Sequence, residues 1–315
     1  MNFSTKVPLS KHQNPIDYYS KVFSLGSCFA ENMADKFEYF KFQNSVNPFG
    51  IIFNPVSIEN LIKRIVEKRE FIEKDIFFHN DLWHCYEVHS ELSNPDKELF
   101  LQNLNRIVFQ SFDDVNKTTH FIVTYGTSWV YRNKNSNKVV ANCHKVLQNQ
   151  FEKEILSVEI IEKSIENTIN LVQKINPNCN FIFTISPVRH VKDGFVENQR
   201  SKAHLICAIQ NSQLSTRNSQ YFPSYEIMMD ELRDYRFYTD DMLHPSKMAI
   251  DYIWKGFLEN YISESIFETM SQIDAIQKGL QHRPFNVASE KHRKFSDNLN
   301  SKILDIQQKY NHITF

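Results

Sequence analysis

Residues 19–40 read YSKVFSLGSCFAENMADKFEYF, and they indicate a strand, a tight turn and a helix in succession. Residues 19–25 have the character of a short strand that runs into Gly26-Ser27. Apolar side chains then recur at helical spacing over residues 28–40, at Phe29, Met33, Phe37 and Phe40. A strand that leads through a tight turn into a helix is the basic unit of α/β folds.

Further strands and helices alternate along the chain. Continuous apolar runs at 121–125 and 181–185 are typical of buried central strands. Two other stretches, 83–89 and 219–225, are predicted as additional strands. The spacing of apolar residues predicts helices at 57–68, 96–116, 157–175, 198–214 and 246–262.

This alternation predicts an α/β fold with a largely parallel sheet. Residues 41–56 contain two Asn-Pro steps and are expected to form a loop. We expect one domain over residues 1–263, with a helical and loop insertion around 57–118. Residues 264–315 are polar and charged with helical patches, and they are expected to form a helical extension.

Composition excludes several classes of protein. Lys and Arg number 36 against 37 Asp and Glu, a balance that argues against a protein whose main role is to bind nucleic acid or an anionic membrane. No apolar run approaches 18 residues and the first ten residues lack an apolar segment, so neither a membrane span nor a signal peptide is expected. The five cysteines form no C-x-x-C pair, which fits reduced thiols in the cytoplasm and argues against a thiolate metal site.

Glycine is scarce, with six residues in 315. Their positions allow no G-x-G-x-x-G, no P-loop and no G-x-S-x-G motif, and the sequence has no H-E-x-x-H. Dinucleotide binding, P-loop phosphate transfer, the α/β-hydrolase elbow and zincin chemistry are therefore poor interpretations. The six glycines are Gly26, Gly50, Gly126, Gly194, Gly256 and Gly279.

Ser27 lies where an α/β fold places catalytic groups, at the carboxyl end of a strand and the start of a helix. The N–H groups and dipole of the helix can stabilise an oxyanion there. The alternative interpretation is that Ser27 only caps the helix. Cys28 is a rival nucleophile, because a helix N-terminus lowers the pKa of a thiol, or else a small buried residue behind the turn.

A second segment, residues 238–246, reads YTDDMLHPS. Asp241 and His244 lie three residues apart, next to a proline that fixes the turn. The carboxylate can then hold the tautomer of the imidazole, whose other nitrogen acts as a general base. Asp-x-x-His alone is common, and a surface turn that leads into a helix is the alternative.

With Ser27, these residues give the chain order Ser…Asp…His, and at this point the sequence resembles a known family. Residues 26–30, GSCFA, match the motif that gives the GSCFA family its name, and the late D-x-x-H-P matches the block shared by the SGNH/GDSL hydrolase superfamily. The resemblance covers most of residues 20–262. It extends through Asn47-Pro48-Phe49-Gly50 and residues 125–131, 142–145, 186–190 and 197–202.

The resemblance implies a three-layer α/β/α sandwich in which Ser27 is the nucleophile, His244 the base and Asp241 its orienting carboxylate. It also implies an oxyanion hole formed by the backbone of Ser27, by Gly50 and by a third block at residues 126–129. Ser128 stands there in place of the superfamily's Asn. Loss of one oxyanion donor typically costs roughly 10²–10³ in kcat, so Ser128, Thr127, Asn47 or another group has to replace it.

Other polar residues are candidates for the substrate pocket. Arg189 and His190 follow a predicted central strand, and Arg189 is expected either to bind an anionic or carbonyl group of the substrate or to form a structural ion pair. His144 lies in a loop expected to line the pocket. His84 and His89 fall on opposite faces of one predicted strand, so a joint metal site is not expected. Two further residues are predicted to face the site, His89 and Trp129.

The sequence therefore predicts a serine esterase or acyltransferase that needs no metal or cofactor. Its substrate is expected to be an acyl ester, possibly acetyl, of a carbohydrate or small molecule. The rival, from another class, is an accessory protein on the same fold that binds a glycan or acyl ligand without turnover. Ser128 favours this rival, and the intact Ser27, Asp241 and His244 favour the enzyme. Oligomeric state and the role of the helical extension are left open.

Overall fold

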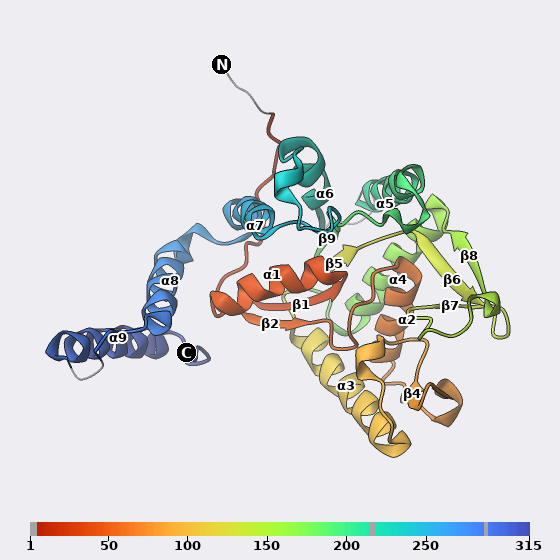
Figure 1. Cartoon of the computed structure of the whole chain (residues 1–315), viewed down its shortest axis with the longest axis horizontal. Helices are drawn as coiled ribbons and strands as arrows, with labels where there is room; N and C mark the ends of the chain where they lie inside the picture. Colours follow the sequence, from red (N-terminus) through yellow and green to blue (C-terminus); the bar gives the residue numbers. More distant parts are fainter. Residues whose placement is uncertain (1–4, 214–217, 287–288) are drawn as a thin grey trace.

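A five-stranded parallel sheet forms the centre of the computed structural model, which describes residues 5–213, 218–286 and 289–315 (Figure 1). Every pair of neighbouring strands in this sheet is parallel. Across the sheet the strands are β10 (Ser219–Phe222), β9 (Asn180–Ile185), β5 (His120–Tyr125), β1 (Lys21–Gly26) and β2 (Gln43–Val46).

Helices cover both faces of the sheet and complete the three-layer α/β/α sandwich that the family resemblance implied (Figure 1). Alternate strand residues point to opposite faces, as at Phe23 and Val22 of β1. Phe23 belongs to one core, formed with α2 (Pro55–Val66), α3 (Lys97–Lys117), α4 (Val158–Ile175) and α5 (Phe195–Gln213). Val22 belongs to the other, formed with α1 (Cys28–Tyr39) and α7 (Lys247–Tyr261).

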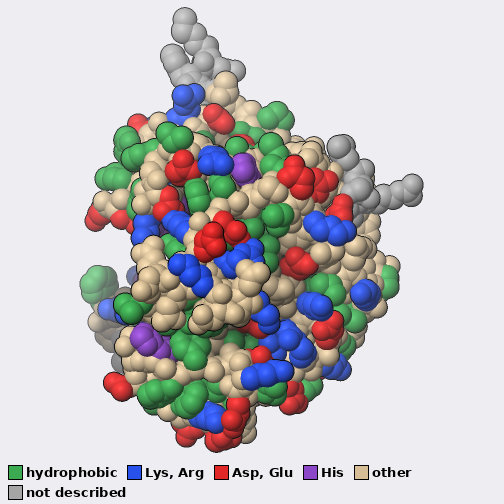
Figure 2. All heavy atoms as spheres, turned by 90° about the vertical axis from the view of Figure 1, so that its right-hand side faces the viewer, with side chains coloured by type: hydrophobic (Ala, Val, Ile, Leu, Met, Phe, Trp, Pro, Cys, Tyr) green, Lys and Arg blue, Asp and Glu red, His purple; other side chains and the backbone are tan. Residues whose placement is uncertain are grey.

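Two small antiparallel sheets accompany the central one. One is a hairpin of β3 (Phe77–His79) and β4 (Leu82–His84). The other joins β6 (Trp129–Asn133) to β7 (Lys138–Val140) and β8 (Phe151–Ile155), on the right of Figure 1. Figure 2 shows this side of the molecule, where side chains of both charge signs are interspersed.

Four predicted elements differ from the structure. The strand expected over residues 219–225 ends at Phe222 and is followed by helix α6 (Ser224–Glu226). Residues 41–56 were expected to form a loop, but Gln43–Val46 form strand β2 at the edge of the sheet, and α2 begins at Pro55. The strand expected over residues 83–89 ends at His84. The helix expected over 198–214 begins at Phe195, and its predicted last residue, Leu214, lies outside the described residues.

The C-terminal extension is helical, as expected, and consists of α8 (Phe267–Gln281) and α9 (Glu290–Lys309). Its apolar residues join the core on the α1 side of the sheet. The Tyr39 hydroxyl donates to Asp274 at 2.8 Å, so the extension contacts the C-terminal end of α1, whereas Ser27 lies at the opposite end. Among the described helices, none is long and apolar enough to cross a bilayer.

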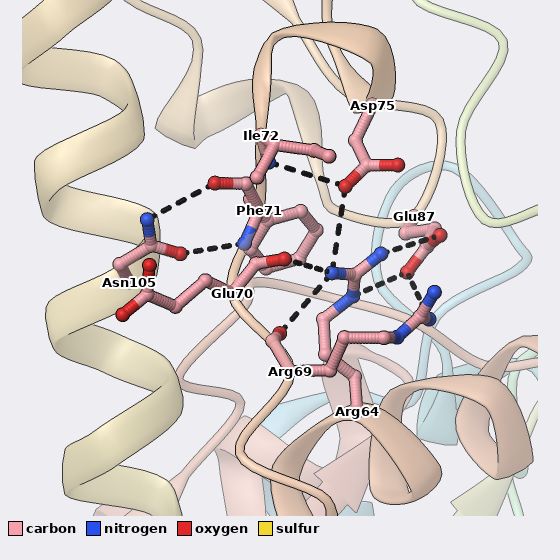
Figure 3. A network of polar contacts seen from close by, with 8 residues as sticks. All are labelled: Arg64, Arg69, Glu70, Phe71, Ile72, Asp75, Glu87 and Asn105. Carbon is pink, nitrogen blue, oxygen red and sulfur yellow. Dashed lines mark hydrogen bonds and ion pairs between the residues drawn. The ribbon is translucent and has the colours of Figure 1, made fainter.

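A buried arginine fixes the segment between α2 and the hairpin (Figure 3). The fully buried Arg64 binds both carboxylate oxygens of Glu87, at 2.8 and 2.9 Å, and donates to the backbone carbonyls of Arg69 and Glu70. Its guanidinium lies 3.8 Å from the ring centroid of Phe71. This network holds residues 69–87 against α2, and with them the loop that carries His89.

Candidate functional site

The turn between β1 and α1 depends on glycine at position 26. Gly26 has φ +147°, and a Cβ placed on it would overlap the carbonyl oxygen of Thr124 in the neighbouring strand β5. Ser27 follows and caps α1, because its Oγ accepts a hydrogen bond from the N–H of Phe29 at 3.2 Å. Ser27 also donates its own N–H to Thr124 O at 3.1 Å and is 1% exposed. The turn therefore places Ser27 at the carboxyl edge of the sheet, with its hydroxyl bound to the helix.

Cys28 is the first residue of α1 and is partly exposed, unlike Ser27. Burial, followed by the charge of Glu31, raises the pKa of the Cys28 thiol. The N–H groups of Cys28 and Phe29 and the charge of Lys202 act in the opposite direction. The more accessible nucleophile of this turn is therefore a thiol that is protonated at neutral pH.

Asp241 and His244 form a hydrogen-bonded pair, with 2.6 Å between Asp241 Oδ2 and His244 Nδ1. The other oxygen, Oδ1, accepts hydrogen bonds from the N–H of His244 at 3.0 Å, the N–H of Leu243 at 2.8 Å and the hydroxyl of Thr239 at 2.7 Å. These contacts, the two backbone N–H groups first, hold the pKa of Asp241 well below its usual range. With the carboxylate on Nδ1, Nε2 of His244 is the nitrogen that can accept a proton.

The loop after β9 brings two other residues to this pair, Arg189 and His190. Arg189 donates its N–H to the carbonyl of Leu243 at 3.1 Å. Burial, then the charges of Lys202 and His244, lowers the pKa of His190 to about 3, so its ring is neutral. No carboxylate in the described ranges lies within 4 Å of the Arg189 guanidinium, which lies over the rings of Phe195 and Tyr238 instead. The structural ion pair considered for Arg189 is therefore not found there.

Asn47, Gly50 and His89 lie on the other side of the Ser27 turn. Asn47 Oδ1 accepts the N–H of Gly26 at 2.8 Å, and its Nδ2 donates to Glu31 at 3.2 Å. Gly50 has φ +75° and lies so close to His89 that a side chain would overlap it. The Gly50 N–H is hydrogen-bonded to the carbonyl of Asn47 at 2.7 Å. Its predicted role in an oxyanion hole therefore requires this turn to open.

The third predicted block contacts α5 through Ser201. The hydroxyl of Ser128 donates to the Ser201 carbonyl at 3.2 Å, and the Ser128 N–H donates to Ser201 Oγ at 2.8 Å. The Thr127 hydroxyl shares a hydrogen bond with the same Ser201 Oγ at 2.8 Å. Because these contacts direct both hydroxyls toward α5, the oxyanion roles of Thr127 and Ser128 stay predictions.

Trp129 and His144 lie in different surroundings. Trp129 Nε1 donates to the carbonyl of Glu197 on α5 at 3.3 Å. His144 Nε2 lies 2.7 Å from the Cys85 carbonyl, its ring is 4.6 Å from that of His84, and burial lowers its pKa to about 4. Their predicted contacts with substrate stay predictions. In the described parts of the chain, no three His, Cys, Asp or Glu residues are grouped so that they could hold a metal ion.

Lys202 received no role from the sequence, although it lies beside the site. Its Nζ donates to the carbonyls of Gly126 at 2.7 Å and Ser186 at 2.8 Å, and the residue is 1% exposed. The sequence of α5 does contain a pattern that could have indicated a role for Lys202. Asn198, Ser201, Lys202 and Leu205 have the spacing of one buried helix face, and all four are buried. Three polar residues on such a face mark a functional or structural contact.

Comparison with known proteins gives a family. The model of the GSCFA family matches residues 21–257. A second model, described as the C-terminal domain of GSCFA domain proteins, matches residues 273–315 and so covers most of α8 and all of α9. No curated protein matches the chain.

Proposed function

The chain belongs to the GSCFA family, and we propose that it is an acyl-ester hydrolase or acyltransferase of the SGNH type with a nucleophile on the turn at residues 26–28. The observation that carries this proposal is the Asp241–His244 pair, with its 2.6 Å hydrogen bond to Nδ1. A carboxylate with three further donors on its other oxygen is held rigidly and stays ionised. Such a carboxylate serves to orient an imidazole base.

Ser27 is the proposed nucleophile. Its Oγ would form a bond to the acyl carbon while its proton moves to Nε2 of His244. The alcohol would leave with that proton, and water or an acceptor hydroxyl would then release the acyl group. Because the hydroxyl of Ser27 caps α1 and is buried, attack requires it to leave the N–H of Phe29 and turn outward.

Cys28 is the second candidate for the nucleophile, and its partial exposure favours it. The thiol would follow the same sequence of steps through a thioester. Its raised pKa makes a general base necessary, since little thiolate forms at neutral pH without one. Both candidates therefore depend on His244.

Binding without turnover is the alternative from another class. Two internal hydrogen bonds favour it, because the N–H of Gly50 and the hydroxyl of Ser128 are both occupied by other groups of the protein. A binding protein has no use for an oriented imidazole, however. The two proposals therefore differ in what His244 contributes.

The test is hydrolysis of short-chain p-nitrophenyl esters and acetylated sugars by the purified chain. Removal of a general base typically costs 10²–10⁴ in rate, so we expect His244→Ala to lower turnover by about that factor. His282→Ala, which removes an exposed imidazole in the C-terminal extension, is the control for the loss of a histidine away from the site. Turnover that is absent in the folded wild type, or unaffected by His244→Ala, contradicts the proposal.

A further inference from the structure

The carboxyl ends of the two central strands are joined by the ammonium group of Lys202. Gly126 directly follows β5 and Ser186 directly follows β9, and Lys202 donates to the carbonyl oxygens of both. The side chain reaches these carbonyls from α5, next to Ser201, which binds Ser128. Lys202 therefore lies at the sheet edge where the superfamily resemblance expects an Asn donor and this chain has Ser128.

The positive charge of Lys202 has no carboxylate partner within 4 Å among the described residues. The contrast with Arg64 is direct, because that cation is equally buried but holds Glu87 through two hydrogen bonds (Figure 3). An unpaired buried ammonium is costly, and burial lowers the pKa of Lys202 to about 7. The neutral side-chain amide of a glutamine can donate to two carbonyls without the cost of burying a charge. The charge of Lys202 therefore points to an electrostatic role.

The charge of Lys202 acts on three neighbouring side chains. Lys202 interacts electrostatically with the Cys28 thiol at the N-terminus of α1 and with the imidazole of His190. Its Nζ also lies 5.3 Å from the ring centroid of Tyr225. The carboxylate of Glu31 acts on Cys28 in the opposite direction to the lysine. The N–H groups at the start of α1 act in the same direction as Lys202.

We propose that Lys202 is a positioning residue whose buried ammonium stabilises negative charge developing at the Ser27–Cys28 turn. Lys202 binds the carbonyl of Gly126 just after β5, and Thr124 of the same strand accepts the N–H of Ser27, so the ammonium and the N-terminus of α1 lie at neighbouring strand ends and act on the same turn. This charge takes over part of the role of the missing Asn donor. The inference rests on the proposed function for its purpose, but its test needs no substrate.

The rate at which iodoacetamide alkylates Cys28 reports how strongly negative charge is stabilised at this turn, because only the thiolate displaces iodide. The rate at Cys28, relative to the exposed Cys207, is followed by peptide mass spectrometry at pH 6.5, where most Lys202 side chains are charged. We expect Lys202→Gln, which keeps an N–H donor but loses the charge, to lower the relative alkylation rate of Cys28 several-fold. Glu31→Gln is the matched control and should raise the alkylation rate of Cys28, because it removes the opposing negative charge.

A merely structural lysine gives a different result. Its loss would loosen the turn and leave the relative rate at Cys28 unchanged or raised, and either outcome in folded Lys202→Gln overturns the proposal. Failure of the esterase assay with a positive alkylation result would reject the proposed function alone.

A second measurement uses the wild-type lysine. The Lys202 titration is followed by NMR of ¹³C-labelled lysine after Cys28 has been modified with iodoacetamide or with iodoacetate. In a Cys207→Ser background, which lacks the exposed thiol, the two adducts at Cys28 differ mainly in one negative charge. We expect the anionic adduct to move the Lys202 midpoint to higher pH than the neutral adduct. Equal midpoints would show that Lys202 does not sense charge at this turn and would overturn the proposal.

Discussion

Replacing Lys202 by methionine tests the buried ammonium through its effect on stability. The folded protein holds this proton less tightly than the unfolded chain, because burial lowers the pKa from 10.5 to about 7. The unfolded chain therefore binds more protons between these two pH values, and the contribution of Lys202 to the free energy of unfolding rises with pH across that range. Lys202→Met removes this dependence and leaves every other titrating group in place.

The magnitude follows from the size of the shift. The pKa difference between the unfolded and folded states corresponds to about 5 kcal/mol in the free energy of unfolding. Of this, about 2 kcal/mol is gained between pH 7 and pH 9. The methionine also removes the donor to Gly126 and Ser186, which costs about 1–3 kcal/mol per carbonyl at every pH. That cost lowers the free energy of unfolding of Lys202→Met by the same amount at every pH, so it does not change how the difference between the two proteins depends on pH.

The assay is urea unfolding of both proteins at pH 7, 8 and 9. We expect the free energy of unfolding of the wild type, minus that of Lys202→Met, to rise by about 2 kcal/mol from pH 7 to pH 9. A difference that stays constant to within about 0.5 kcal/mol would refute the reasoning, because the lysine would then titrate alike in the folded and unfolded states.

Three further results are expected. Gly26→Ala should destabilise the fold by about 3 kcal/mol or more in chemical denaturation, because its Cβ would overlap Thr124 O at a strained φ, and an unchanged midpoint would contradict this. Glu87→Ala should cost up to about 3–5 kcal/mol, because the buried Arg64 then keeps only Asp75, 3.6 Å away, as a carboxylate partner, and Glu87→Gln, which retains an acceptor, should cost less; no loss in either variant would argue against the ion pair. Asp241→Asn, whose Oδ1 can still accept the two backbone N–H groups, should lower ester hydrolysis by roughly 10²–10⁴ at a temperature where the variant is folded, and full activity would exclude an orienting role.

The central fold was predictable because its signals are apolar. β5 and β9 are buried on both faces and read as continuous hydrophobic runs, and α7 carries one apolar stripe. β2 has the polar sequence QNSV and forms part of the sheet only because β1 offers it a partner in register. No local pattern carries that information, so the edge strand was missed.

The candidate site was predictable in its parts but not in its contacts. The spacing of Asp241 and His244 suffices to predict their hydrogen bond, because three residues in one turn determine it. Which hydroxyls point into the site depends on tertiary packing. Ser128 and Thr127 face Ser201, and Lys202 comes from a helix about 75 residues further along the chain.

Labelling with a fluorophosphonate probe, mapped by peptide mass spectrometry, tests the central claim most directly. The account predicts an adduct on Ser27 that disappears in His244→Ala and survives in Cys28→Ala. An adduct on Cys28 that likewise requires His244 would keep the proposed reaction and assign it to the second candidate nucleophile. Folded protein that forms no adduct on either residue, or forms it equally without His244, would contradict the claim that this turn carries an activated nucleophile.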